Sequence, residues 1–172
     1  MAEDKQPVNT VGKKVEVTFS GGHETDPRDK GRPVVLIASA LDVTSEVFRD
    51  AFSGVRPAQG RGPTGDEARR NKEALMKVLQ PHGITNDRLD EVSNYYRYKP
   101  GKGNLWKTTQ AKAYAVVEGG KVKQIVVTEL GSGYSSSPTA IVEGLNNVKL
   151  KVEIQFTKEF KSNGAVASVK TE

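Results

Sequence analysis

Hydrophobic and polar positions alternate along most of the last third of the chain, which is the pattern of half-buried β-strands. Gly119-Gly120 and Asn163-Gly164 stand where hairpin turns are expected, so we predict two similar hairpins at 113–128 and 152–171. An earlier alternating run at 15–19 predicts one more strand, which we expect to join the C-terminal sheet. The strand-like runs of the last third cover 114–117, 122–128, 139–142, 148–157 and 165–171.

The middle of the chain has helical spacing and helix caps instead. An apolar run at 34–41 predicts a first helix, and Thr44 is placed to cap a second one over 45–52. Thr64 and Glu67 match a capping box at the start of a helix that runs to about residue 80. Thr85 is placed to cap a fourth helix over 86–96.

A weak internal repeat links these helices. Residues 42–51 align with residues 83–92, and both segments follow the order helix, tight turn, Thr cap, helix. Two helical hairpins packed together would bury both apolar stripes. Duplication and a coincidence of capping chemistry both account for the alignment.

These patterns predict an α+β fold, in which a small helical-hairpin region packs with an antiparallel β-hairpin repeat sheet. We divide the chain into a disordered N-terminus at 1–12, an N-terminal strand plus helical region at 13–110, and a β-hairpin repeat region at 111–172. The early strand should make the last two one compact unit rather than two free domains.

Composition narrows the function classes. A net charge of +5 with 27% charged residues is mildly basic, well below the Lys and Arg loading of a dedicated nucleic-acid binder. The absence of cysteine excludes disulfides, thiolate metal sites and a cysteine nucleophile. No apolar stretch is long enough for a membrane span. The polar start lacks a signal-peptide core, which suits a cytoplasmic protein or a mature form without its leader.

The run 121–142 contains a Gly-Ser-Gly-Tyr turn followed by a Pro, carried by Gly131, Gly133, Tyr134, Ser136 and Pro138. It resembles the β-repeat of bacterial extracellular proteins and phage tail or fibre proteins, over roughly residues 111–172. The helical part is similar to uncharacterised regions of predicted secreted bacterial proteins. The resemblance implies an envelope or extracellular location and a structural or binding role rather than an activity.

The turn residues also have physical roles that need no family. Gly131 and Gly133 permit a positive φ in a tight turn. Tyr134 can lay its ring over a neighbouring strand and bring its hydroxyl to a backbone group. Pro138 ends the turn at the edge of the next strand. All of these roles are structural.

A basic-aromatic connector at 94–112 is the best candidate ligand site. Its aromatic rings could stack sugars or bases while its cations hold an anionic polymer. Alternatively, the rings fill the junction between helices and sheet and leave the cations in water. The candidate residues are Tyr95, Arg97, Tyr98, Lys99, Lys102, Trp106 and Lys107.

The loop 23–29 is the densest polar cluster. Its candidate metal ligands, of the oxygen and nitrogen types that divalent cations accept, are His23, Glu24, Asp26 and Asp29. Their spacing matches neither an EF-hand nor a zincin helix. The alternative is a solvated loop in which the two aspartates cap turns or pair with Arg28 and Arg32.

The sequence thus favours a non-enzymatic envelope or extracellular module that needs no cofactor and whose partner is an acidic polymer or a protein. A nucleic-acid-binding protein that uses the basic-aromatic connector is an alternative, although nucleic acid is the less favoured partner. A metal-dependent enzyme at the loop 23–29 is a second alternative. We expect an extracellular or periplasmic location, with a cytoplasmic one left open.

Overall fold

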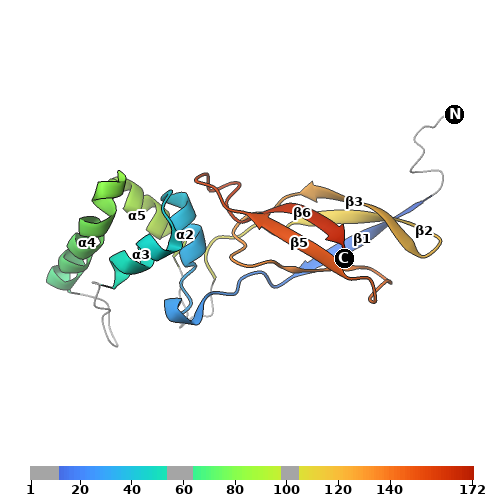
Figure 1. Cartoon of the computed structure of the whole chain (residues 1–172), viewed down its shortest axis with the longest axis horizontal. Helices are drawn as coiled ribbons and strands as arrows, with labels where there is room; N and C mark the ends of the chain where they lie inside the picture. Colours follow the sequence, from blue (N-terminus) through green and yellow to red (C-terminus); the bar gives the residue numbers. More distant parts are fainter. Residues whose placement is uncertain (1–11, 54–63, 98–104) are drawn as a thin grey trace. The chain divides into compact units, whose positions relative to one another are not determined.

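The computed structural model describes residues 12–53, 64–97 and 105–172, and its chain divides into two compact units. The β unit comprises Met1–Thr25 and Thr108–Glu172, and the helical unit comprises Asp26–Lys107. The chain therefore leaves the β unit after Thr25 and re-enters it at Thr108 (Figure 1). Helices combined with antiparallel sheets confirm the predicted α+β class.

This division differs from the expected one. The prediction places the strand at 13–20 in one region with the helices, over 13–110, but in the structure this strand belongs to the β unit. The prediction of one compact unit also differs from the structure, which has two. The physical reason is that this strand finds its backbone partners in the C-terminal part of the chain. The predicted N-terminus lies mostly outside the described residues.

Within the described residues, the β unit contains a four-stranded antiparallel sheet and a two-stranded one. The larger sheet has the order β3-β2-β1-β4. Val17 lies opposite Ala113 on one side and Val142 on the other, which confirms that the early strand joins the C-terminal sheet. The strands are β1 (Lys13–Ser20), β2 (Lys112–Glu118), β3 (Lys121–Glu129), β4 (Thr139–Val142), β5 (Leu150–Gln155) and β6 (Ala165–Thr171).

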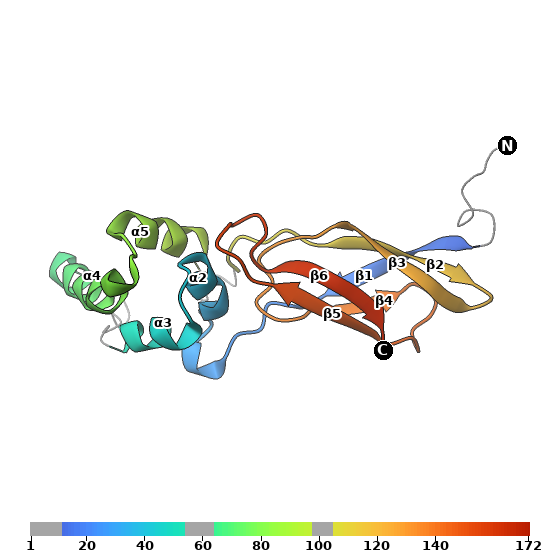
Figure 2. The same cartoon turned by 45° about the horizontal axis from the view of Figure 1, so that its top comes forward.

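The β5-β6 hairpin covers one face of the larger sheet (Figure 2). Alternate residues of each strand point to the same face, so the small apolar side chains of both layers meet in one core. Burial of this shared face is what selects the register, because a shift of one residue would turn the apolar side chains outward. The buried core residues are Val17, Phe19, Ala111, Ala113, Ala115, Tyr134, Ala140, Val142, Val152, Val166 and Val169.

The two predicted hairpin turns differ in the structure. Gly119 and Gly120 form the two-residue turn between β2 and β3, with φ angles of 60° and 76° that favour glycine. The prediction of a tight turn at Asn163-Gly164 is wrong, because β5 ends at residue 155 and a longer loop follows. The Asn163 carboxamide oxygen accepts a hydrogen bond from the Thr157 N–H at 3.0 Å, so this side chain closes the loop internally.

The described part of the helical unit contains four α-helices, at the places that the caps predict. The hydroxyl oxygens of Thr44, Thr64 and Thr85 each accept a hydrogen bond from the N–H three residues further on, at 3.1 Å. The Glu67 carboxylate accepts from the Thr64 N–H, which completes the capping box. The helices are α2 (Val34–Ala40), α3 (Ser45–Phe52), α4 (Gly65–Leu79) and α5 (Asn86–Tyr95). Short 3-10 turns are η2 (Pro27–Asp29) and η3 (Gln80–His82).

The predicted internal repeat has a matching backbone geometry. Asp42 and Gly83, which are aligned in the sequence, have φ angles of 60° and 84°. Each is followed by one apolar residue and then by a capping threonine. The same local geometry therefore joins α2 to α3 and, after η3, leads into α5. No helix among the described residues combines the length and apolarity that crossing a membrane requires.

Candidate anion-binding site

The helical unit begins with a tight polar turn. The Asp26 carboxylate accepts hydrogen bonds from the Arg28 N–H at 2.9 Å and from the Arg28 guanidinium at 3.0 and 2.9 Å. These bonds hold the pKa of Asp26 well below its usual range. The backbone of Lys30 then adopts the left-handed conformation, with φ 52° and ψ 43°, which residues other than glycine rarely take. The turn redirects the chain toward α2 and sets Lys30 beside Arg32.

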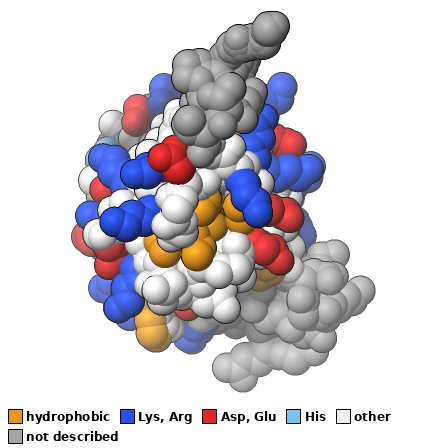
Figure 3. Space-filling model, turned by 90° about the vertical axis from the view of Figure 1, so that its right-hand side faces the viewer, with side chains coloured by type: hydrophobic (Ala, Val, Ile, Leu, Met, Phe, Trp, Pro, Cys, Tyr) orange, Lys and Arg blue, Asp and Glu red, His pale blue; other side chains and the backbone are white. Residues whose placement is uncertain are grey.

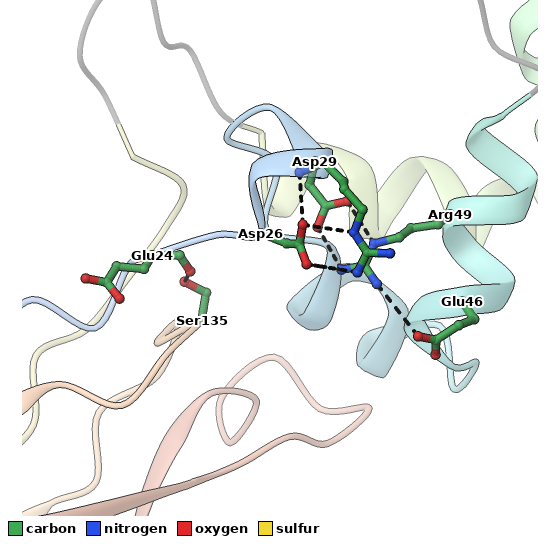
Figure 4. A network of polar contacts seen from close by, with 7 residues as sticks. Glu24, Asp26, Asp29, Glu46, Arg49 and Ser135 are labelled. Carbon is green, nitrogen blue, oxygen red and sulfur yellow. Dashed lines mark hydrogen bonds and ion pairs between the residues drawn. The ribbon is translucent and has the colours of Figure 1, made fainter.

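A buried carboxylate ties this turn to α3. Asp29 is only 6% exposed, and both of its oxygens accept from the Arg49 guanidinium at 2.9 Å. A bidentate pair of this kind is strong and directional. The hydrogen bonds to Asp29 raise the pKa of Arg49, which also lies 3.8 Å from carboxylate oxygens of Asp26 and Glu46 (Figure 4). Arg49 is thus fixed in the turn.

Arg32 is held differently. Its guanidinium lies 4.2 Å from the centre of the Phe52 ring, a cation–π contact, and makes no ion pair with a described residue. Burial lowers the pKa of Arg32, but an arginine remains charged in a protein. Lys30 also has no ion pair within the described residues. Two cations are therefore left for an external anion.

These side chains line one pocket of about 460 Å³, within the usual size range of small-molecule sites. We call it the Arg32 pocket. Four cations line the pocket, and three carboxylates pair with two of these cations. The described charged groups therefore add up to one positive charge. The lining residues are Arg28, Asp29, Lys30, Arg32, Val34, Phe48, Arg49, Phe52 and Ser53. The carboxylates are those of Asp26, Asp29 and Glu46.

The predicted metal site is wrong. His23 and Glu24 belong to the β unit, whereas Asp26 and Asp29 belong to the helical unit and are taken up by arginines. The part of the chain that the structure describes has no group of three or more His, Asp or Glu residues that could hold a metal ion. The solvated-loop alternative is right for Asp26, which caps a turn and pairs with Arg28.

The partner of Asp29 differs from that alternative. The pair forms with Arg49 of α3, twenty positions away, rather than with Arg32, which is only three positions from Asp29 in the sequence. His23 stacks on Tyr134 with ring centres 5.3 Å apart, and burial lowers the pKa of its imidazole. Its ring is thus part of the packing of the β unit.

The basic-aromatic connector is only partly a surface. Trp106 is 3% exposed, so its ring is buried and the prediction that it stacks a ligand is wrong. Tyr95 is half-buried, with the Lys107 ammonium 4.9 Å from its ring centre. The exposed Arg97 donates to the Asn94 carboxamide oxygen at 2.7 Å. The other candidates, Tyr98, Lys99 and Lys102, lie outside the described residues.

The glycine-tyrosine turn takes the structural roles that its sequence predicts. Gly131 and Gly133 have φ angles of 70° and 83°. The Tyr134 hydroxyl accepts from the Ala111 N–H at 2.9 Å in the buried core. The Tyr134 N–H donates to the Gly164 carbonyl, and the Gly133 N–H donates to the Asn163 carbonyl. The turn therefore joins three separate stretches of the β unit.

Sequence reasoning missed the Arg32 pocket. The available signal was the close spacing of Arg28, Lys30 and Arg32 in a short polar loop. What the sequence does not contain is the distance from this loop to Phe52 and Arg49, which only the packing of α3 creates. Two of the candidate metal ligands of the loop, Asp26 and Asp29, instead pair with Arg28 and Arg49 and hold these cations in place.

Charge is distributed differently elsewhere on the surface. On the face in Figure 3, Lys and Arg side chains are interspersed with Asp and Glu around a small group of hydrophobic side chains. A mixed face of this kind produces little net field of one sign.

Comparison with protein-family models, curated proteins and solved structures finds no significant match to this chain.

Proposed function

We propose that the protein is a non-enzymatic binding module of the cell envelope or the extracellular space. In this proposal the helical unit binds an acidic polymer. The observation that carries the proposal is the Arg32 pocket, where Lys30 and Arg32 lack ion pairs among the described residues.

The chemistry of the pocket favours binding over catalysis. Guanidinium and ammonium groups hold anions well, but they keep their protons near neutral pH and so make poor general acids or bases. The Ser53 hydroxyl, the one hydroxyl in the lining, donates to the Asp50 carbonyl at 2.6 Å. The carboxylates of the site are paired with arginines.

The test is binding of labelled polygalacturonate over a salt series. We expect affinity to fall as salt rises, because the interaction is between opposite charges. The double variant Lys30→Gln with Arg32→Gln should bind about tenfold more weakly, since two partly exposed charge contacts of about 0.7 kcal/mol each add to about 1.4 kcal/mol. Lys77→Gln with Arg69→Gln, on the exposed side of α4, is the matched control and should bind as the parent does.

Two results would reject the proposal. The first is no binding of polygalacturonate by the parent protein at low salt. The second is an equal loss in the pocket variant and the α4 control, which would mean that net charge alone matters. Binding of single-stranded DNA, measured in the same way, tests the nucleic-acid alternative. That alternative is supported only if the parent protein prefers DNA to polygalacturonate and the α4 control variant binds DNA as the parent does.

The proposed location has its own test. Fractionation of cells that express the natural gene should place the protein outside the cytoplasm, with a cytoplasmic enzyme as the marker. Recovery with that marker would contradict the location while leaving the polymer-binding proposal to the salt series.

A further inference from the structure

We infer that the Arg32 pocket takes one carboxylate-bearing sugar residue of the acidic polymer, rather than a stretch of charged backbone. The inference rests on the proposed function and adds the ligand group, its charge and the side chains that recognise it. Three features of the described residues carry it: the charge left over, the shape of the free cation, and the apolar wall.

The charge balance favours a ligand group with a single negative charge. Four cations line the pocket, and three carboxylates pair with two of them, so the net charge of these seven groups is one positive charge. One carboxylate neutralises that charge. A phosphate dianion would leave an excess negative charge close to the buried Asp29, which is unfavourable in a partly desolvated site.

The free cation is suited to a planar group. Arg32 presents a flat fork of N–H donors, which matches the two oxygens of a carboxylate. The Phe52 ring lies 4.2 Å from that guanidinium and restricts its orientation, so less side-chain entropy is lost when a ligand binds. Lys30 can approach the same carboxylate as a point charge from the neighbouring turn. Phe52 acts here as a positioning residue.

Part of the pocket lining is apolar. Val34, Phe48 and Phe52 contribute to the lining beside the charged groups. Phe48 and Phe52 have ring centres 4.8 Å apart with their planes tilted by 54°, so the buried Phe48 supports the Phe52 ring. A pyranose ring has an apolar C–H face next to its carboxylate, and this combination matches an apolar wall beside a fork of donors. The pocket volume of about 460 Å³ has room for such a residue.

The experiment is titration of the full chain with trigalacturonate, neutral trigalactose and inorganic phosphate at one salt concentration. We expect trigalacturonate to bind, trigalactose to bind at least about tenfold more weakly, and phosphate to bind more weakly than trigalacturonate. Arg32→Lys keeps the charge but removes the fork, and it should weaken trigalacturonate binding about tenfold. Lys77→Gln on α4 is the control and should have no effect.

The outcomes separate the two proposals. Binding of polygalacturonate without binding of trigalacturonate, or an Arg32→Lys variant that binds trigalacturonate as the parent does, would overturn the pocket inference and leave polymer binding intact. Phosphate binding as tight as that of trigalacturonate would also overturn it. If the parent protein binds no polygalacturonate at all, both the polymer-binding proposal and the pocket inference are wrong. If Arg32→Lys does not fold, the exposed Lys30→Gln variant gives the same test, with an expected loss of at least about threefold.

Discussion

The β unit and the helical unit use their polar groups in opposite ways. In the β unit, the residues of the glycine-tyrosine turn are bonded to other parts of the same unit: the Tyr134 hydroxyl accepts from the Ala111 N–H, and the Gly133 N–H donates to the Asn163 carbonyl. In the helical unit, Arg32 and Lys30 line a pocket without an ion pair to a described residue. Groups that are satisfied internally support the fold, and only cations left over are available to a ligand.

The same contrast exists inside the helical unit. Arg49 in α3 and Asp90 in α5 occupy aligned positions of the internal repeat. Arg49 pairs with Asp29, whereas Asp90 pairs with Lys72 of α4. The two helical hairpins thus share backbone geometry and capping but carry opposite charges at this position. Shared capping residues therefore predict the same local backbone fold, but they do not predict that both hairpins carry a binding site.

The largest effect should come from Gly131→Ala in the β unit. A Cβ at this position would lie 2.7 Å from the Thr109 carbonyl oxygen and 2.8 Å from the Ala111 nitrogen, at a φ of 70°. We expect the free energy of unfolding to fall by about 3 kcal/mol, measured by urea denaturation. Gly144→Ala also has a positive φ but has open space, so it should cost only about 1 kcal/mol. Equal losses would show that the close approach is unimportant.

Tyr134→Phe should be the next most costly change. It removes the acceptor of the buried Ala111 N–H and leaves that donor without its bond, at a cost of about 2 kcal/mol. The control is Tyr114→Phe, on the opposite face of the sheet, where we expect a change below about 0.5 kcal/mol. If the denaturation curves of the two variants coincide, the structural role of the Tyr134 hydroxyl is contradicted. Trigalacturonate binding should be unchanged in both.

Asp29→Asn changes the helical unit in stability and in charge. The bidentate partner of Arg49 loses its negative charge, and we expect a loss of about 2 kcal/mol in the free energy of unfolding. The pocket gains a second positive charge, so its affinity for inorganic phosphate should rise relative to trigalacturonate. Asp50→Asn on the exposed side of α3 is the control. An unchanged phosphate preference would mean that the charge count does not set ligand choice.

The smallest effect should be a pH dependence that originates in the β unit. Burial lowers the pKa of His23 in the folded protein, so the unfolded chain takes up the proton first as pH falls. Stability should therefore decrease below the ordinary pKa of histidine, near 6.5. Thermal melts from pH 7.5 to 5.5 should show a smaller decrease for His23→Gln than for His82→Gln. The reverse order would contradict a pKa of His23 that partial burial lowers.

The helical part of the fold follows from local chemistry, which explains why the sequence predicts it well. A threonine cap or a capping box depends on residues three positions apart, as for Thr64 and Glu67. The turn at Gly119-Gly120 is local in the same way, since it needs only two residues with positive φ. The loop closed by Asn163 fails as a prediction because its decisive bond, from Thr157, depends on where β5 ends.

The candidate site depends on longer distances. Asp29 and Arg49 are twenty positions apart, and no residue pattern near either one selects the other over Arg32. For the same reason, the basic, aromatic stretch around Trp106 gives no sign in the sequence that this ring is buried. Residue types predicted the presence of charged loops and aromatic rings, whereas the packing of helices decided which of them face a pocket.

The division of the chain also affects its synthesis on the ribosome. Val17 and its partner Ala113 are 96 positions apart, because the entire helical unit is inserted between β1 and β2. At typical translation rates, β1 waits roughly 5–20 s for β2, and longer for β4. The helical unit is continuous in sequence and rich in local contacts, so it can form during that interval. The first strand leaves the ribosome early but is among the last segments to find its place.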